Sequence, residues 1–467
     1  MGTISGLTDD ESAVLNELWS TWLCKLQRNM LRATYYDHKN VLKNLGIAIP
    51  PHLANIDMAL GWPAKSVDVM ARRCKFERFT VPGNDDPLDI APMLAENDFT
   101  MLLPQAITST FVHSCSFWMA TKGDTSIGEP EVLLSTQSAM FGAGLWDYRL
   151  RRLKAAFSVS NMDTMGRVTE WLMFLPRLTI RGRWDRHWDI ERYEHTLDRL
   201  PVEVLPYQPR LDRPFGKSRI TRSVMGLTDS ALRTLVRMEI GAEFYSSPQR
   251  WIMGADESMF QDAEGNTKSQ WQALMGRIWA APADPENPGE LPQVGQFNPA
   301  VPTPHTEQLR SLAAMFASET SLPLSELGIV HDNPSSAEAI EAAERSLIIE
   351  SKYVMDSCFT PRLVRIAQTA LQIRDGWDEM PPEVAKLSVR WSAPENTMIS
   401  AATDAVVKIL GAVPDLAESN VPFEMLDWND ATIQRARADM DRAKRDRESV
   451  EQPPIPDDAV PSEGVTP

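Results

Sequence analysis

The sequence predicts an α+β protein made of several units. Its 467 residues are 43% apolar, which is enough to bury a core, and they correspond to about three domains at roughly 150 residues each. Short β-rich segments fill residues 115–208, whereas apolar residues at helical spacing mark the N-terminus and the region after residue 228. This separation of strand-forming and helix-forming segments is typical of the α+β class.

The N-terminal region opens with a helix. Thr8 and Glu11 form a capping box. Apolar residues then follow at helical spacing: Val14, Leu15, Leu18, Trp19, Trp22 and Leu23. Turn-forming residues divide the chain into short pieces up to about residue 85: Gly46, Pro50, Pro51, Gly61 and Pro63. A second helix is predicted over 97–110, although Pro104 lies within it.

The central region is predicted to be mixed, with short strands separated by Gly, Pro and Asp turns. The strands are expected at 116–120, 131–135, 168–174 and 201–206. Between Arg149 and Arg222 there are 16 Lys and Arg against 9 Asp and Glu, a local charge of +7 in an acidic chain. We interpret this excess as a solvated sheet face or as subunit contacts.

Two amphipathic helices follow, at about 228–245 and 304–319. The first carries Leu232, Leu235, Val236, Glu239, Ile240 and Glu243, and the second carries Leu309, Leu312, Ala313, Phe316 and Ala317. They bracket residues 249–303, which hold Trp251, Trp271 and Trp279 and a stretch too rich in Pro and Gly for a helix or a central strand.

A loop over 320–334 leads to a second capping box, Ser335 to Glu338, which opens a helix reaching about Asp375. Pro361 lies inside this helix, where proline costs about 3 kcal/mol unless the helix bends, so we expect a kink. A strand is predicted at 386–391 and helices at 401–410 and 430–448. The final 17 residues, with five prolines and a charge of −4, are typical of a disordered acidic tail.

Charge and cysteine usage exclude several classes of protein. The net charge of −17 argues against a histone-like binder of duplex DNA. The four cysteines lie dozens of residues apart, which favours neither a zinc site nor a disulfide framework. We also find no signal peptide and no apolar run of about 18 residues, and therefore expect a soluble, intracellular protein.

No catalytic motif is complete. Gly216-Lys217-Ser218 resembles the end of a phosphate-binding loop, but Leu211 stands where the leading glycine is required and Pro214 interrupts the loop. Gly142-Ala-Gly144 lacks the third glycine of a dinucleotide fingerprint. His187, Glu191 and His195 would converge on a helix like metal ligands, but the alternating residues around them indicate a strand, on which they spread apart. We predict no active site, no metal site and no cofactor.

The order of these elements, together with several short segments, resembles that of a known protein family. It includes the segments Leu200-Pro-Val-Glu-Val-Leu, Pro214-Phe-Gly-Lys-Ser-Arg-Ile-Thr221, Leu227-Thr-Asp-Ser-Ala-Leu-Arg-Thr-Leu, Ala242-Glu-Phe-Tyr-Ser-Ser-Pro-Gln-Arg250 and Asn333-Pro-Ser-Ser-Ala-Glu-Ala339. From about residue 10 to 445 the chain resembles the portal proteins of tailed bacteriophages, particularly those of actinobacterial phages. The resemblance implies a portal fold with an α/β wing, a two-helix stem, a small mixed clip, a long kinked helix and a helical crown.

The boundaries carried over from the family follow the elements above. The resemblance implies a wing at 1–225, stem helices at 226–247 and 304–319, a clip at 248–303, a tunnel loop at 320–334, a kinked helix with a wing return strand at 335–399, a crown at 400–446 and a tail at 447–467. Gly216-Lys217-Ser218 would then lie in the turn that leads into the first stem helix.

The resemblance also implies a function. Portal subunits form a ring, commonly of twelve, at one capsid vertex, and the ring encloses the channel through which DNA is packaged and ejected. Implied partners are double-stranded DNA, terminase, the major capsid protein and head-tail connector proteins, with no membrane. The implied location is the virion, and the host cytoplasm during assembly.

Candidate site residues follow from these roles. Glu239 and Glu243, one helical turn apart, would suit a lumen that repels phosphate so that DNA can slide. Glu326, His331 and Asp332 are the tunnel-loop candidates for facing DNA. In the clip, the candidates are Trp251, Trp271 and Trp279. They would either anchor a partner or form local core, and the sequence favours neither interpretation.

Two other classes compete with this reading. A packaging ATPase would need an intact phosphate-binding loop and an acidic strand, and the sequence shows neither. Another virion structural protein, such as a capsid or scaffolding subunit, would also lack catalysis. A helix pair that brackets a Trp- and Pro-rich excursion favours the portal over a scaffolding protein, which is usually mostly helical.

Overall fold

The computed structural model describes residues 4–42, 58–82, 87–245, 250–253, 293–296, 303–328, 337–394, 399–426, 428 and 430–451. It divides into two compact units, Met1–Trp391 and Ser392–Pro467. Both helices and sheets are present, as the predicted α+β class requires. No helix among the described residues has the length and apolar character needed to cross a membrane.

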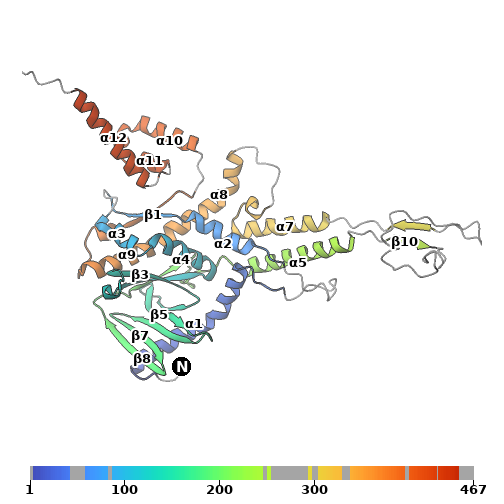
Figure 1. Cartoon of the computed structure of the whole chain (residues 1–467), viewed down its shortest axis with the longest axis horizontal. Coiled ribbons are helices and arrows are strands. Elements are labelled where there is room, and N and C mark those ends of the chain that lie inside the picture. The colour runs from blue at the N-terminus through green and yellow to red at the C-terminus, as the bar shows by residue number, and fades with distance from the viewer. Residues whose placement is uncertain are drawn as a thin grey trace, which may run out of the picture. The chain divides into compact units, whose positions relative to one another are not determined.

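The first unit holds most of the helices and all the strands (Figure 1). Its helices are α1 (Asp9–Tyr36), α2 (Trp62–Arg73), α3 (Ile90–Glu96), α4 (Phe99–His113), α5 (Arg222–Tyr245), α7 (Thr303–Thr320), α8 (Ala337–Tyr353) and α9 (Thr360–Asp375). Its strands are β1 (Phe76–Thr80), β2 (Cys115–Lys122), β3 (Val132–Ser138), β4 (Gly142–Asp147), β5 (Arg152–Met162), β6 (Val168–Leu175), β7 (Leu178–Asp185), β8 (His187–Glu194), β9 (Val202–Pro206), β10 (Arg250–Met253), β11 (Gln293–Gln296) and β12 (Ser388–Trp391).

Helix α1 packs against a five-stranded antiparallel sheet of order β4-β5-β6-β7-β8 (Figure 1). The predicted capping box is confirmed, because the Thr8 hydroxyl accepts from the Glu11 amide and the Glu11 carboxylate accepts from the Thr8 amide. Alternate residues of β5 face opposite sides of the sheet, since side chains on a strand alternate. Phe157 lies in the core under α1, and the neighbouring Ala156 lies in the core shared with a second sheet.

The second sheet has three strands in the order β3-β2-β9 and lies between the first sheet and the helices. Phe117 of β2 faces the five-stranded sheet, whereas Trp118 faces the large core built with α4 and α9. Strand β2 is therefore buried on both faces, and its first six residues are all buried. The four strands predicted at 116–120, 131–135, 168–174 and 201–206 are confirmed as β2, β3, β6 and β9.

The long helix predicted over 335–375 is confirmed with an irregular middle. It consists of α8, a π-helical segment η6 (Val354–Phe359) and α9. In η6 the Thr360 amide bonds back to the carbonyl of Met355, five residues earlier, immediately before Pro361. Proline has no N–H to donate, and the widened turn is where the helix accommodates it. The second helix with an internal proline, α4, runs to His113 despite Pro104.

Three expectations need correction. The prolines and glycines before residue 85 do not only break the chain, because Pro63 lies in the first turn of α2, where its missing N–H costs nothing. Helix α5 begins at Arg222, six residues before the predicted start at 228. Strands β4 and β5 were not predicted, because small residues such as Gly142 and Gly144 mask the alternating pattern.

The second unit is helical, with α10 (Ile399–Ala412), α11 (Val421–Met425) and α12 (Asp430–Glu451). The two longer helices were predicted at 401–410 and 430–448. Arg437 of α12 stacks over the ring of Phe423 at 5.0 Å and donates a 3.1 Å hydrogen bond to Asn420. These contacts fix α12 against α11.

Candidate channel site: the paired helices α5 and α7 and their base

Helices α5 and α7 run antiparallel and pack side by side (Figure 1). Leu232, Val236 and Ile240 of α5 are buried, as are Ala313 and Phe316 of α7. The apolar stripes that the sequence predicts are thus the contact faces of this pair and of its packing on the main core.

The remaining faces of the two helices are polar and exposed. Glu239 and Arg237 of α5 are both exposed, as are Glu307 and Arg310 of α7. Residues two apart on a helix point about 200° away from each other. Glu239 and Arg237 therefore belong to different faces of α5, neither of which is covered within one subunit.

The other predicted site residues are described only in part. The backbone of Glu243 lies in α5, and Trp251 lies on β10, paired with Gly295 of β11. His331, Asp332, Trp271 and Trp279 lie outside the described residues.

The loop after α7 begins with a tight, well-bonded turn. Ser321 has a φ of 56°, and the Leu322 amide donates to the Ala317 carbonyl at 3.1 Å, which is the bond of a Schellman cap. A 3-10 turn η5 (Leu324–Leu327) follows and buries Leu327. Glu326 of η5 forms a half-exposed ion pair with Lys65 of α2 at 3.5 Å. The predicted tunnel-loop residue Glu326 is therefore held against α2 at the start of the loop.

Arg219, three residues before α5, lies buried at the base of the helix pair. Its Nε donates to the carbonyl of Ser66 in α2 at 2.6 Å, and its Nη2 donates to the carbonyl of Thr320 at the end of α7, also at 2.6 Å. Its Nη1 donates to the Tyr207 hydroxyl and to the carboxylate of Glu350 in α8, both at 2.9 Å. One guanidinium group thus fixes the entry to α5, the exit from α7 and the kinked helix relative to one another.

The rest of this cluster is equally well bonded. The Tyr207 hydroxyl donates to Glu350, and Gln208 donates to the same carboxylate oxygen at 3.1 Å. Burial raises the pKa of Tyr207 above its usual range, an effect that Arg219 opposes and Glu350 reinforces. Tyr207 therefore stays neutral and able to donate. Four of the five N–H donors of Arg219 are used inside the fold, so we interpret this cluster as structural.

The Gly216-Lys217-Ser218 motif forms the turn directly before Arg219. Gly216 has a φ of +71°, and a Cβ added there would lie 2.2 Å from the carbonyl oxygen of Tyr207. The Lys217 amide donates to that carbonyl at 2.9 Å, and the buried Ser218 hydroxyl donates to the Val112 carbonyl at 2.6 Å. The glycine allows two backbone segments to touch, as expected for the turn that leads into the first helix of the pair.

The histidines weighed as metal ligands are spread along a strand, as the sequence interpretation has it. His187 and Glu191 lie on β8 and His195 directly after it. At about 3.3 Å per residue, positions four apart on a strand are about 13 Å apart. Among the described residues no three His, Cys, Asp or Glu side chains are grouped closely enough to hold a metal ion.

Comparisons with known proteins give this arrangement a context. No protein-family model matches the chain. The portal protein of Mycobacterium phage L5 is 28% identical over 458 residues, covering 95% of this chain and 88% of that protein. The portal protein of Mycobacterium phage D29 is 26% identical over 459 residues, covering 94% of this chain and 88% of that protein.

Solved structures also align with the chain. A chain from the virion of the native gene transfer agent particle has a TM-score of 0.42 at 14% identity, covering 78% of this chain and 89% of that chain. A chain from the neck of the native particle, computed with C12 symmetry, has a TM-score of 0.41 at the same identity and coverage. The sequence relationship spans nearly the whole of both mycobacteriophage proteins, and the chain is therefore a homologue of bacteriophage portal proteins.

Proposed function

We propose that the protein is a portal subunit that forms a ring at one capsid vertex and encloses the channel for DNA packaging and ejection. The observation that carries this proposal is the similarity to two named portal proteins over about 95% of the chain. In the virion the ring would contact the major capsid protein and would dock terminase and then the head-tail connector proteins. The proposed role is structural and needs no cofactor.

The helix pair supports a ring. Helices α5 and α7 bury one face against each other and the core, and each leaves polar faces uncovered. In a ring of identical subunits one face of each subunit meets a different face of its neighbour, and a third face is left to line the channel. Since both helices of the pair leave polar faces exposed, the pair fits this requirement.

Charges on α5 suggest which side is which. We assign Glu239, together with Glu243 one turn later, to the lumen, because an acidic wall repels DNA phosphates and lets the duplex slide. Arg237 points about 200° away from Glu239 and would face the neighbouring subunit. The stem of the ring would thus be acidic inside and held by charged contacts between subunits.

The loop after α7 is proposed to narrow the channel. Its first part is fixed by the Arg219 cluster and by the Glu326–Lys65 pair, so the loop would leave α7 from a defined position. His331 and Asp332, farther along the loop, are proposed to face DNA together with Glu326. The remaining segments keep the roles expected from the family, with 248–303 as the clip, 400–446 as the crown and Trp251, Trp271 and Trp279 as docking anchors in the clip.

The ring is tested by light scattering of the purified protein combined with negative-stain imaging along the particle axis. We expect closed rings with a central hole and a mass near a dozen times 52.4 kDa. A compact dimer that hydrolyses nucleotide would overturn the proposal.

The loop is tested in the virus. Replacing residues 329–334 by a Gly/Ser linker should leave rings intact and impair packaging or retention of DNA. Normal packaging by this variant would contradict the proposed role of the loop.

A further inference from the structure

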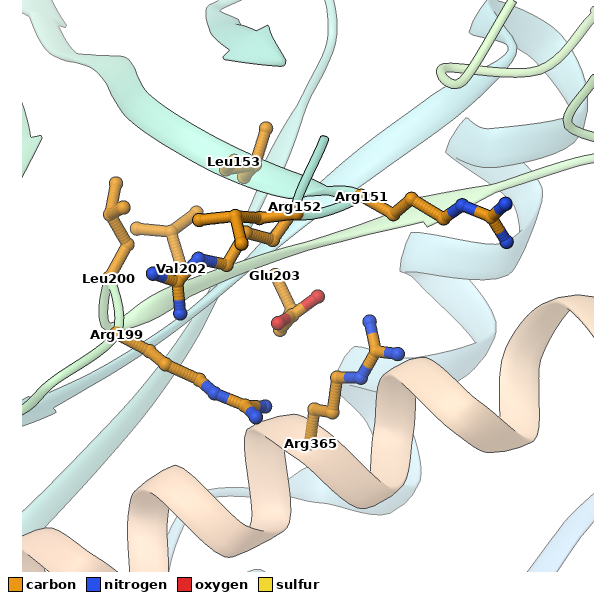
Figure 2. A pocket seen from close by; sticks show the side chains of 9 residues that line it. Arg151, Arg152, Leu153, Arg199, Leu200, Val202, Glu203 and Arg365 are labelled. Carbon is orange, nitrogen blue, oxygen red and sulfur yellow. The ribbon is translucent and has the colours of Figure 1, made fainter. Parts of the chain in front are cut away.

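Two adjoining cavities lie between helix α9 and the segment that leads into β9. Their volumes are about 410 and 190 Å³, and both are lined by Arg199 and Arg365. The larger cavity is also lined by Leu150, Arg151, Arg152, Leu153, Leu200, Val202 and Glu203 (Figure 2). We call the two cavities together the α9 groove. Its combined size lies within the range used for ligand binding.

The α9 groove carries arginines that have no hydrogen-bond or close ion-pair partner among the described residues. Figure 2 shows Arg199 and Arg365 extending into the same space below Glu203, with Arg152 on the other side. Within the described residues, the guanidinium groups of these three arginines donate no hydrogen bond and form no ion pair within 4.0 Å. The carboxylate of Glu203 is already paired with Arg362 at 3.4 Å. The groove therefore has an excess of positive charge and of unused donors.

Burial adds to this imbalance. Arg365 is partly buried, and burial lowers its pKa although nearby Glu203 opposes the effect. A buried guanidinium group is stable when it is paired with an anion. The planar fork of arginine binds carboxylates through two parallel hydrogen bonds. A carboxylate placed between Arg199 and Arg365 would supply the missing partner.

The smaller cavity offers a different surface. It is lined by Trp377 together with Leu197 and Met380, and Met380 is 43% exposed. The indole Nε1 of Trp377 is buried and has no acceptor among the described residues. Asp378 lines this end of the groove as well, so the positive charge is concentrated in the larger cavity. An aromatic ring beside apolar side chains is suited to an extended, proline-rich peptide, which packs its rings on such a surface.

The chain itself contains a segment of this chemistry. Residues 452–467 read Gln-Pro-Pro-Ile-Pro-Asp-Asp-Ala-Val-Pro-Ser-Glu-Gly-Val-Thr-Pro, with prolines directly before the acidic pair Asp457 and Asp458. A proline run directly beside two carboxylates matches an aromatic cavity that adjoins an arginine cavity. The phosphates of nucleic acid would satisfy the arginines but would leave the Trp377 surface unused.

We propose that the α9 groove binds residues 452–467 of a second copy of this chain. Asp457 and Asp458 bind at Arg199 and Arg365, and the preceding prolines pack on Trp377. The inference rests on the proposed ring in one respect only, namely that the ring supplies a neighbouring copy at high local concentration. Peptide binding by the groove can be measured without a ring.

The first test is fluorescence anisotropy with a labelled peptide of residues 452–467. The receptor is the full-length protein carrying D457N and D458N, so that its own segment does not compete. We expect saturable binding that weakens at high salt and is at least tenfold weaker for the D457N/D458N peptide. Arg199→Glu with Arg365→Glu should abolish binding, and Trp377→Phe, which reduces the aromatic surface of the smaller cavity, should weaken it about threefold.

Arg183→Glu is the control, because Arg183 is exposed on β7, away from the groove, and carries the same charge change as each single groove substitution. Binding should be unchanged in this variant. Lack of binding at millimolar peptide, or equal binding by the groove variants, would overturn the proposal. Equal binding by the Asn peptide together with displacement by tripolyphosphate or a short DNA duplex would identify a phosphate site instead.

A second test shows whether the segment comes from another copy. Exposed Cys24 is replaced by Ser, and an Arg199→Cys chain is mixed with an Asp458→Cys chain under mild oxidation. A disulfide between the two chains, seen on a non-reducing gel, can form only between copies and is the expected result. A disulfide that forms only when both cysteines are in one chain would contradict the second-copy assignment. Imaging of the same sample reports ring formation separately, so a missing ring and a missing groove contact are distinguishable.

Discussion

Apolar packing holds α1 on the sheet β4–β8, whereas hydrogen bonds of the buried Arg219 hold together the base of α5 and α7. In the first region Phe157 and Trp171 fill the space under α1, and hydrogen bonds run mainly between neighbouring strands. In the second region one side chain bonds to α2, α7, α8 and Tyr207.

The difference separates a body that is complete by itself from a helix pair that is not. Apolar packing tolerates small shifts, whereas a buried charge with four bonded partners requires one geometry. A rigid base of this kind suits helices whose outer faces are to meet neighbouring subunits in register. The predictions below test this contrast, beginning with the largest expected effect.

Replacing Arg219 should cause the largest loss. In Arg219→Met the partly buried carboxylate of Glu350 loses its ion-pair partner and the carbonyls of Ser66 and Thr320 lose their donor, and we expect the free energy of unfolding to fall by about 3 kcal/mol. Urea denaturation followed by tryptophan fluorescence measures the change. Arg213→Met is the control, because the Arg213 side chain is exposed and, among the described residues, pairs only with Asp212 at 3.8 Å. Equal stability of the two variants would show that the cluster does not hold the base together.

Substitution of Gly216 should have the next largest effect. Gly216→Ala places a Cβ 2.2 Å from a backbone oxygen at a φ of +71°, and we expect a loss of at least about 2 kcal/mol. Gly226→Ala in α5 is the matched control, since nothing lies within 4 Å of the added carbon and alanine favours a helix by about 1 kcal/mol. Thermal unfolding should therefore shift in opposite directions in the two variants. A shift in the same direction would contradict the role of the Gly216 turn.

His113, at the end of α4, should make stability depend on pH. Burial, with help from Arg32, lowers the pKa of His113 to about 4 from an ordinary value of 6.5. The neutral side chain is thus the form that the fold accepts. Its stabilising contribution is complete above pH 6.5 and is lost as the pH falls toward 4, by up to about 3 kcal/mol.

The comparison of wild type with His113→Leu isolates this contribution. Denaturation curves between pH 7 and 4 should show a smaller decline in stability for the variant. His187→Leu, on exposed β8, should decline like the wild type. An unchanged slope in His113→Leu would show that this histidine does not control acid stability.

The ion pair between Lys65 and Glu326 should matter least for stability. Both side chains are partly exposed, at 50% and 31%, and such pairs contribute less than about 1 kcal/mol. Glu326→Gln should leave thermal unfolding within about 1 °C of wild type, whereas Lys65→Met serves as the partner control. Because stability is unchanged, a packaging defect in Glu326→Gln would report a role of the loop in DNA passage. A large loss of stability would instead show that Glu326 is structural.

The features that the sequence predicts well are those encoded locally. The capping box at Thr8, the stripes of α5 and α7 and the disruption beside Pro361 each depend on residues within a few turns of one another. The same holds for the hairpin of β7 and β8, whose extended backbone separates His187 from Glu191 along the strand.

The features that the sequence does not reveal depend on distant partners or on ambiguous residues. Ser66, Thr320 and Glu350 lie 101 to 153 residues from Arg219, and no local pattern connects them. Pro63 was interpreted as a turn signal because proline is common both in turns and in the first turn of a helix. The incomplete phosphate-loop motif at Gly216 drew attention to a constrained turn. The constraint is a close contact with the backbone of Tyr207, which no sequence pattern indicates.

Electron cryomicroscopy of the purified assembly tests the central claim most directly. We expect a closed ring in which α5 and α7 line the axis, with Glu239 toward the lumen and Arg237 at the boundary with the neighbouring subunit. A ring in which these two helices face outward, or an assembly without a central channel, would contradict it.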